Sequence, residues 1–156
     1  MSISFSPVLS PFDLESLDEL FRRDLSENSD SPTRDQLRKM IQQKARFVIA
    51  KDDRVIIGFA CLIQCHLLRF SFGVIHDVVV KNDPRYRRKG IGRNMIRLLL
   101  NQSVQDGLKF VELTSRPSRE EANRLYVSMG FERKNTNMYV MYVYRWHPES
   151  DPPHAA

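Results

Sequence analysis

Two glycines and a run of cations lie where a β-branched segment meets a segment of apolar-periodic residues. The turn holds Gly90 and Gly92 and carries five cations within nine residues: Arg85, Arg87, Arg88, Lys89 and Arg93. The apolar spacing that follows predicts a helix beginning at Ile91. The first amides of a helix have no intrahelical partner and carry a partial positive charge. Because glycine has no Cβ, an anion can lie directly on them, so the turn predicts a site for a diphosphate or a phosphate cluster.

Other glycine motifs fit this turn less well. A dinucleotide-binding motif requires a small residue where Met95 stands, and a P-loop requires Gly-Lys-Ser/Thr after four spacer residues. An exposed basic turn that merely starts a helix stays open as an alternative, because short motifs match by chance.

Two motifs in a fixed order resemble a known family. Arg87-x-x-Gly90-x-Gly92 after a valine-rich strand resembles the coenzyme A loop of the GCN5-related N-acetyltransferase (GNAT) superfamily. Residues 112–131 are similar to the second half of that superfamily, and the resemblance covers about residues 45–145. It implies an α/β GNAT fold, with a mixed, mostly antiparallel sheet of six to seven strands and about four flanking helices. It also implies acetyl-CoA as co-substrate and no metal.

The resemblance also implies which residues bind the coenzyme. The backbone of a valine run would pair with the pantetheine arm, the loop would hold the phosphates, and the later helix would add contacts. These residues are Val78, Val79, Val80, Arg85, Arg87, Arg88, Lys89, Gly90, Ile91, Gly92, Arg93, Ser118, Asn123 and Tyr126. The loop before Gly90 is about two residues longer than usual, so the sequence does not assign each arginine to a phosphate.

Tyr126 resembles the tyrosine that often protonates the leaving thiolate in this superfamily. It stands in an Ala122-x-x-Leu125-Tyr126 pattern on the apolar face of a predicted helix. A tyrosine on such a face can also be an ordinary core residue, and this alternative stays open.

His76 and Asp77 are the candidate general bases. His76 replaces a carboxylate that is common in similar sequences, and an imidazole suits proton acceptance near neutral pH. In a regular strand the two side chains point to opposite faces, so without a bulge only one of them faces the acceptor. A structural role for His76 is the alternative.

Length and composition indicate one domain at residues 1–146 and a mobile tail at 147–156. The chain has 156 residues, a net charge of +5 and 42% hydrophobic residues. We find no signal peptide at the N-terminus and no apolar run near the ~20 residues that span a bilayer, so we expect a cytoplasmic protein without a membrane partner. Cys61 and Cys65 read as free buried thiols rather than metal ligands.

Periodicity and turn residues predict the order of elements. Capping-box spacing occurs at Thr33/Gln36 and Ser118/Glu121, and Gly130 is placed for a left-handed C-terminal cap. The predicted strands are 3–9, 47–50, 55–68, 70–80, 110–114 and 137–146, and the predicted helices are 12–25, 33–44, 91–105 and 118–129.

The function that follows is transfer of an acetyl group from acetyl-CoA to a primary amine by direct attack in a ternary complex. One alternative is a module that binds coenzyme A or another phosphate ligand without turnover. A nucleic-acid binder is less favoured, because the loop alone accounts for the excess of positive charge. The acceptor, a small molecule or a protein amine, is not identifiable from sequence, and a homodimer is left open.

Overall fold

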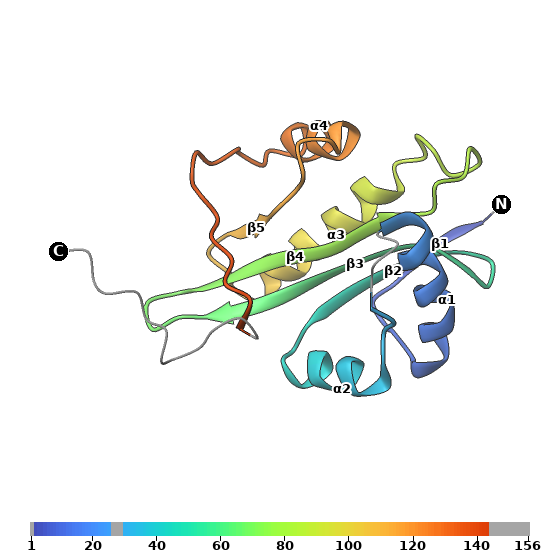
Figure 1. The fold of residues 1–156 in the computed structure, drawn as a ribbon, viewed down its shortest axis with the longest axis horizontal. Coiled ribbons are helices and arrows are strands. Elements are labelled where there is room, and N and C mark those ends of the chain that lie inside the picture. Colours follow the sequence, from blue (N-terminus) through green and yellow to red (C-terminus); the bar gives the residue numbers. More distant parts are fainter. Residues whose placement is uncertain (1, 26–29, 144–156) are drawn as a thin grey trace.

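A computed structural model describes residues 2–25 and 30–143 (Figure 1). The strands are β1 (Ile3–Ser6), β2 (Arg46–Asp52), β3 (Val55–His66), β4 (Ser71–Val80) and β5 (Val111–Leu113). The helices are α1 (Leu14–Leu20), α2 (Arg34–Gln42), α3 (Ile91–Gln105) and α4 (Glu120–Ser128), with a 3-10 turn at Pro11–Asp13 and a π-helical turn at Phe21–Leu25. The predicted order of elements is confirmed as far as α4.

The strands form one mixed sheet in the order β1-β2-β3-β4-β5. The first three pairings are antiparallel, and β4 pairs with β5 in parallel after the chain crosses over through α3. This crossover brings the end of β4, the start of α3 and the loop after β5 to the same side of the molecule (Figure 1).

Each face of the sheet buries its own core. On one face, α1 and α2 contribute Leu17, Leu20 and Leu37 to a cluster with alternate residues of β2 and β3. On the other face, Met95 and Leu99 of α3 are fully buried, and α4 packs at the edge of the same cluster. Each such side chain contributes about 1.5–3 kcal/mol on burial. The sheet is therefore a rigid floor between two layers of helix.

The strand count differs from the prediction. The described residues form five strands rather than six to seven, and the part of the predicted last strand that is described, residues 137–143, is not a strand. Its large apolar side chains are more than half exposed, Tyr139 at 87% and Val143 at 81% among them. The alternation alone misled the prediction, because a strand also needs a partner edge. Residues 144–146 and the predicted tail at 147–156 lie outside the described residues.

Helix ends are confirmed at two of three predicted signals. Thr33 caps α2 in a capping box with Gln36, as predicted. Gly130 adopts φ +92°, and the hydrogen bonds that follow α4 form a Schellman motif, also as predicted. The Ser118 capping box is wrong: α4 begins at Glu120, and Arg119 occupies the cap position without a side-chain cap.

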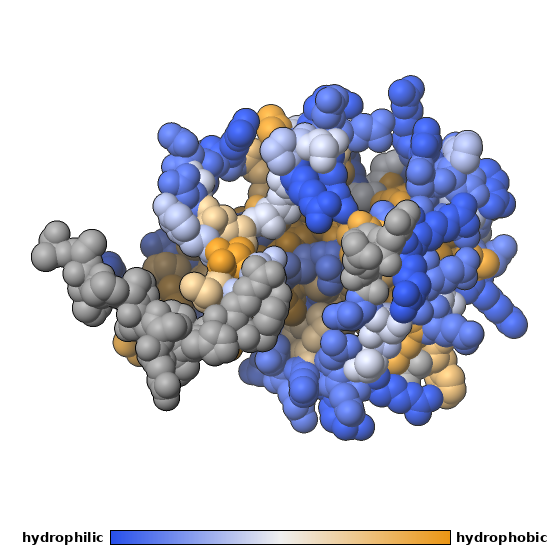
Figure 2. Space-filling model, in the orientation of Figure 1, coloured by the Kyte–Doolittle hydropathy of each residue, from blue (hydrophilic) through white to orange (hydrophobic). Residues whose placement is uncertain are grey.

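The surface is mostly hydrophilic on the face shown in Figure 2. Phe12 falls within the helix predicted at 12–25, but it lies in the 3-10 turn before α1 and is 90% exposed. Within residues 2–25 and 30–143, no helix combines the length and the apolar character of a bilayer span.

Candidate active site

The start of α3 leaves main-chain donors unused. Gly90 is the N-cap residue, with φ +70° and no side-chain cap, and the first hydrogen bond of the helix runs from the Asn94 amide to the Gly90 carbonyl at 2.9 Å. The amides of Ile91, Gly92 and Arg93 therefore have no intrahelical acceptor. The dipole of α3 makes this end of the helix favourable for an anion.

Both loop glycines leave room for a ligand. A Cβ at Gly90 would meet nothing within 4 Å, and the residue is exposed. A Cβ at Gly92 would lie 3.4 Å from Leu125 Cδ2 and 3.8 Å from Val80 Cγ2. Gly92 thus lies between α4 and the end of β4, where a ligand on the amides can also reach β4.

The five cations of the glycine loop (residues 85–93) differ in their partners. Arg85 pairs with Asp83 at 2.8 Å, and its hydrogen bonds lower the pKa of that carboxyl to about 2. The Arg87 side chain donates to the neutral Asn82 amide oxygen and Arg93 to the Ser128 hydroxyl, so both keep their net charge available. Among the described residues, Arg88 and Lys89 have no hydrogen-bond or ion-pair partner.

Two contacts fix the longer loop to the body of the protein. Tyr86 is 5% exposed, and its hydroxyl donates to Asp52 Oδ2 at 3.2 Å. The Asn82 amide donates to Asp24 Oδ1 at 3.0 Å, which ties the loop to the π-helical turn after α1. The extra residues of the loop are therefore held in place between two anchors.

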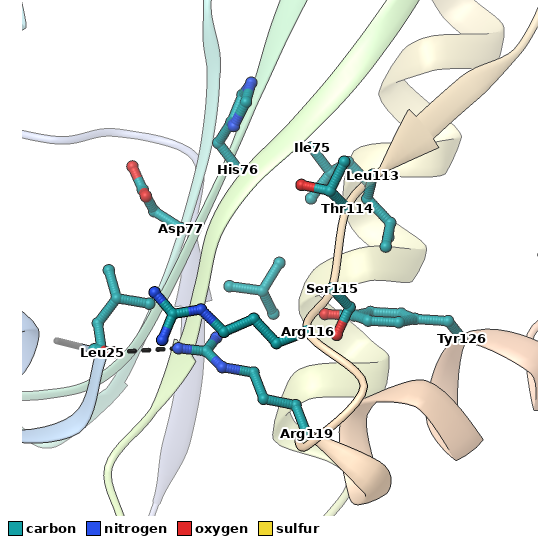
Figure 3. A pocket seen from close by; sticks show the side chains of 11 residues that line it. Leu25, Ile75, His76, Asp77, Leu113, Thr114, Ser115, Arg116, Arg119 and Tyr126 are labelled. Carbon is teal, nitrogen blue, oxygen red and sulfur yellow. Dashed lines mark hydrogen bonds between the residues drawn. The ribbon is translucent and has the colours of Figure 1, made fainter. Parts of the chain in front are cut away.

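A β-bulge in β4 puts both candidate bases on one face. Phe59 pairs with Val79 and Cys61 with His76, so Asp77 and Val78 together oppose the single residue Ala60. Asp77 adopts φ +52°, a conformation that aspartate tolerates better than most residues. Figure 3 shows the His76 and Asp77 side chains on the same side of β4, so the expectation that only one faces the acceptor does not apply.

The edge of β4 beyond the bulge is not covered by β5. The two strands pair only from Gly73 to Ile75, opposite Val111 to Leu113. The Lys81 amide donates to the Ile57 carbonyl on the β3 side, and main-chain groups alternate along an antiparallel ladder. Val80 therefore turns its main-chain groups to the open edge, whereas Val79 turns its own to β3.

A pocket of about 360 Å³ occupies the place where β4 and β5 separate. We call it the splay pocket; its lining comes from β4, from the chain after β5, from Tyr126 of α4 and from Leu25 of the π-helical turn (Figure 3). Tyr126 packs with the core on the α3 face, whereas the neighbours of Asp77 belong to the α1 face. The pocket therefore joins the two faces of the sheet.

Tyr126 is held with its hydroxyl end at the pocket. Its carbonyl accepts the Phe131 amide at 3.1 Å in the Schellman motif, and the two rings meet edge to face at 6.0 Å. Burial raises the pKa of the Tyr126 hydroxyl, and the charge of Arg119 offsets part of the rise. The hydroxyl is thus protonated at neutral pH and can donate a proton.

Asp77 lies against the thiol of Cys61. The Cys61 Sγ is 3.6 Å from the His76 carbonyl oxygen and 4.0 Å from Asp77 Oδ2. Desolvation raises the pKa of the Asp77 carboxyl, and His76 offsets part of this effect. Burial likewise raises the pKa of the Cys61 thiol, so Cys61 is not a thiolate nucleophile.

Comparison with known proteins decides the family. The sequence profile of the Acetyltransferase (GNAT) family matches residues 14–131. The chain belongs to the GNAT acetyltransferase family. N-alpha-acetyltransferase 30 of Xenopus laevis is 28% identical over 87 residues, which make up 56% of this chain and 31% of that protein. The chain thus spans less than a third of this curated relative.

Solved structures show the same fold. An acetyltransferase of Trypanosoma brucei has a TM-score of 0.75 at 23% identity, covering 90% of this chain and all of the other. AAC(6')-Iy, in complex with the bisubstrate analog CoA-S-monomethyl-acetylneamine, has a TM-score of 0.69 at 16% identity, with 91% and 99% covered. The GNAT resemblance drawn from the two motifs is confirmed.

The two coenzyme contacts predicted at Ser118 and Asn123 do not line the splay pocket. The Asn123 amide group donates to the Arg116 carbonyl at 2.9 Å, so it fixes the turn before α4. Ser118 is exposed in that turn and does not line the pocket. Their role in coenzyme binding stays a prediction.

Seven residues that line the splay pocket are not among the predicted site residues. They are Leu25, Ile75, Leu113, Thr114, Ser115, Arg116 and Arg119. Residues 113–119 lie in the stretch that resembles the family, but the resemblance assigned no role to these side chains. Their place depends on the separation of β4 and β5, for which the sequence carries no direct signal.

In the described part of this GNAT chain, no group of three His, Cys, Asp or Glu side chains is arranged to hold a metal ion. Cys61 and Cys65 are free thiols, as predicted, but only Cys61 is buried, and Cys65 is partly exposed.

Proposed function

We propose that this protein transfers an acetyl group from acetyl-CoA to a primary amine by direct attack in a ternary complex. The observation that carries the proposal is the splay pocket, which places a tyrosine hydroxyl and two candidate bases on opposite sides of an uncovered strand edge. The GNAT family membership supports the same chemistry.

Binding of the coenzyme would use the two ends of this arrangement. The amides of Ile91, Gly92 and Arg93, with Arg87, Arg88 and Lys89 around them, suit a pyrophosphate. The open edge of β4 at Val80 suits the amide groups of the pantetheine arm. The complex of AAC(6')-Iy with a coenzyme A bisubstrate analog, on the same fold, supports binding of a coenzyme.

The residues of the pocket would then accept and donate the protons of the reaction. Acetyl-CoA supplies the thioester whose carbonyl carbon is attacked by the amine nitrogen, so that a C–N bond forms and the C–S bond breaks. His76 or Asp77 takes up the proton that the amine loses, directly or through water. Tyr126 donates its proton to the leaving thiolate and is protonated again from solvent.

The test follows release of free thiol from acetyl-CoA across a panel of primary amines. We expect thiol release that depends on the amine and falls strongly in Tyr126→Phe, together with acetyl-CoA binding that is unchanged in this variant. Binding without amine-dependent release from any amine would contradict the proposal and favour the coenzyme-binding module. Salt-sensitive binding of polyanions in general would favour the nucleic-acid binder.

The location and the assembly of the protein stay predictions. A cytoplasmic protein is expected from the sequence, and cell fractionation tests it. A homodimer stays open, and sedimentation of the purified chain measures it.

A further inference from the structure

Two arginines cross the splay pocket toward the side of the candidate bases. Arg116 and Arg119 come from the chain after β5, and both side chains extend toward Leu25 in Figure 3. Arg119 donates to the Leu25 carbonyl at 3.0 Å, although the two residues are 94 positions apart. This hydrogen bond holds Arg119 on the face where His76 and Asp77 also lie.

Neither guanidinium group is neutralised in the described part of the chain. No described carboxylate oxygen lies within 4.0 Å of either one, and Asp77 on the facing wall is not close enough to pair. The Arg116 guanidinium makes no hydrogen bond to a described residue, and the Arg119 guanidinium contacts only a neutral carbonyl. Two guanidinium groups without a carboxylate partner in one pocket favour an anionic ligand.

A buried hydroxyl in the same wall is also unpaired. Ser115 lines the pocket, and its Oγ is buried with no hydrogen-bond partner among the described residues. Buried polar groups are nearly always satisfied in native proteins, so this hydroxyl leaves hydrogen-bonding capacity unused in the wall of the pocket.

We propose that the acceptor is a small primary amine that carries a carboxylate or a phosphate, with the acidic group held by Arg116 and Arg119 and the amine directed to His76 and Asp77. This inference rests on the proposed function and names its substrate class. The arginines come from the chain after β5, whereas the imidazole and the carboxyl come from the bulge of β4, so the acidic group and the amine of one ligand would meet side chains of different segments. A zwitterionic amine matches this arrangement, whereas a plain amine or a polyamine leaves the arginines unpaired.

The pocket has room for a small acceptor. Its volume of about 360 Å³ equals roughly twelve water molecules at ~30 Å³ each, and the thioester end of the coenzyme takes part of that space. An amino acid or a phosphorylated amino alcohol fits the remainder.

The test compares matched amines that differ only in the acidic group. One arm pairs an amino acid with its carboxamide, and the other pairs phosphoethanolamine with ethanolamine, with kcat/KM read from thiol release. We expect a preference of about tenfold or more for the acidic member in at least one arm, since charge-assisted hydrogen bonds carry the difference. The arm with the larger preference distinguishes a carboxylate from a phosphate.

Variants separate acceptor binding from coenzyme binding. Arg116→Gln should raise KM for the acidic amine by about tenfold and leave kcat/KM for its neutral partner and KM for acetyl-CoA unchanged. The fold should tolerate this change, because the Arg116 guanidinium makes no hydrogen bond or ion pair with a described side chain. Arg116→Glu should reverse the preference within each pair. Arg124→Gln is the matched control: Arg124 is on α4, 67% exposed and paired with Glu120, and its loss should change neither value.

Three results would overturn this inference alone: equal kcat/KM for acidic and neutral amines in the wild type, a preference that survives in Arg116→Gln, or an effect of Arg116→Gln on KM for acetyl-CoA instead. Absence of turnover with every amine, while acetyl-CoA binds, would instead overturn the proposed function on which this inference rests.

Discussion

The glycine loop and the splay pocket meet the substrates by different means. In the glycine loop the main chain makes the site, because three amides at the start of α3 have no intrahelical acceptor. In the splay pocket the side chains of distant segments make the site, with Leu25 and Arg119 joined by one hydrogen bond. A backbone site should tolerate side-chain changes one at a time and control affinity, whereas a side-chain site should control rate and choice of acceptor.

The largest effect that sharpens this comparison is on the rate. Tyr126→Phe should lower kcat by about 100-fold, because a positioned general acid contributes at least that much. The dissociation constant for acetyl-CoA should stay the same, since the phenyl ring keeps its packing on Phe131. Steady-state kinetics and calorimetry on one preparation measure both. A weaker binding of acetyl-CoA with little loss of kcat would make Tyr126 part of the binding site instead.

The next largest effect is on the affinity for acetyl-CoA, and it leaves kcat unchanged. Arg87→Ala with Arg88→Ala should raise the dissociation constant for acetyl-CoA by about tenfold or more, because each removes a cation that is not neutralised by a carboxylate. Arg85→Ala is the matched control, since the Arg85 charge is already paired with Asp83. If Arg85→Ala weakens binding as much as the double variant, the distinction between paired and unpaired cations fails.

A stability difference tests the backbone of the loop. Gly90→Ala should destabilise the protein by about 1–2 kcal/mol, because alanine is strained at φ +70° although its Cβ has open space. Gly92→Ala has ordinary φ, and its Cβ would make van der Waals contact with Leu125, so its stability should stay near the wild type. Urea unfolding of both variants measures this. Equal stability of the two would show that the left-handed turn is not needed.

The smallest effect concerns the bulge in the splay pocket. Desolvation raises the pKa of the Asp77 carboxyl in the folded state. The stability that this carboxyl contributes is therefore fully present below its unfolded pKa. It is lost as the pH rises through its folded pKa. Asp77→Asn resembles the protonated form, so it should raise Tm slightly at pH 7 and leave it unchanged at pH 3. A lower Tm at pH 7 would mean that the charged carboxylate stabilises the bulge.

Turnover in Asp77→Asn and in His76→Ala separates the two candidate bases. If Asp77 is the base, Asp77→Asn should abolish most of the turnover, whereas His76→Ala should do so if the imidazole takes the proton. If turnover is kept in both variants, water alone takes up the proton of the amine.

Local sequence signals predicted the glycine loop well. The bounds of α3 at Ile91 and Gln105 match the prediction, and the Gly130 cap was read from one residue and its spacing. These features depend on contacts within a few residues, so the pattern of side chains determines them directly.

Long-range arrangement accounts for what the sequence did not reveal. The bulge at Asp77 arises from pairing between β3 and β4, and the separation of β4 from β5 arises because only three residues of β5 pair. The hydrogen bond from Arg119 to Leu25 joins residues 94 positions apart. The predicted strand at 137–146 failed over its described part for a similar reason, since alternation does not supply a partner strand.

The central claim, that main-chain donors at the start of α3 hold the coenzyme so that its thioester reaches the splay pocket, is tested most directly by amide NMR during titration with acetyl-CoA. We predict that the largest amide shifts occur at Ile91, Gly92 and Arg93, with further shifts at Val80 and Tyr126. Saturable binding of acetyl-CoA that leaves the amides of Ile91, Gly92 and Arg93 unmoved would contradict the account.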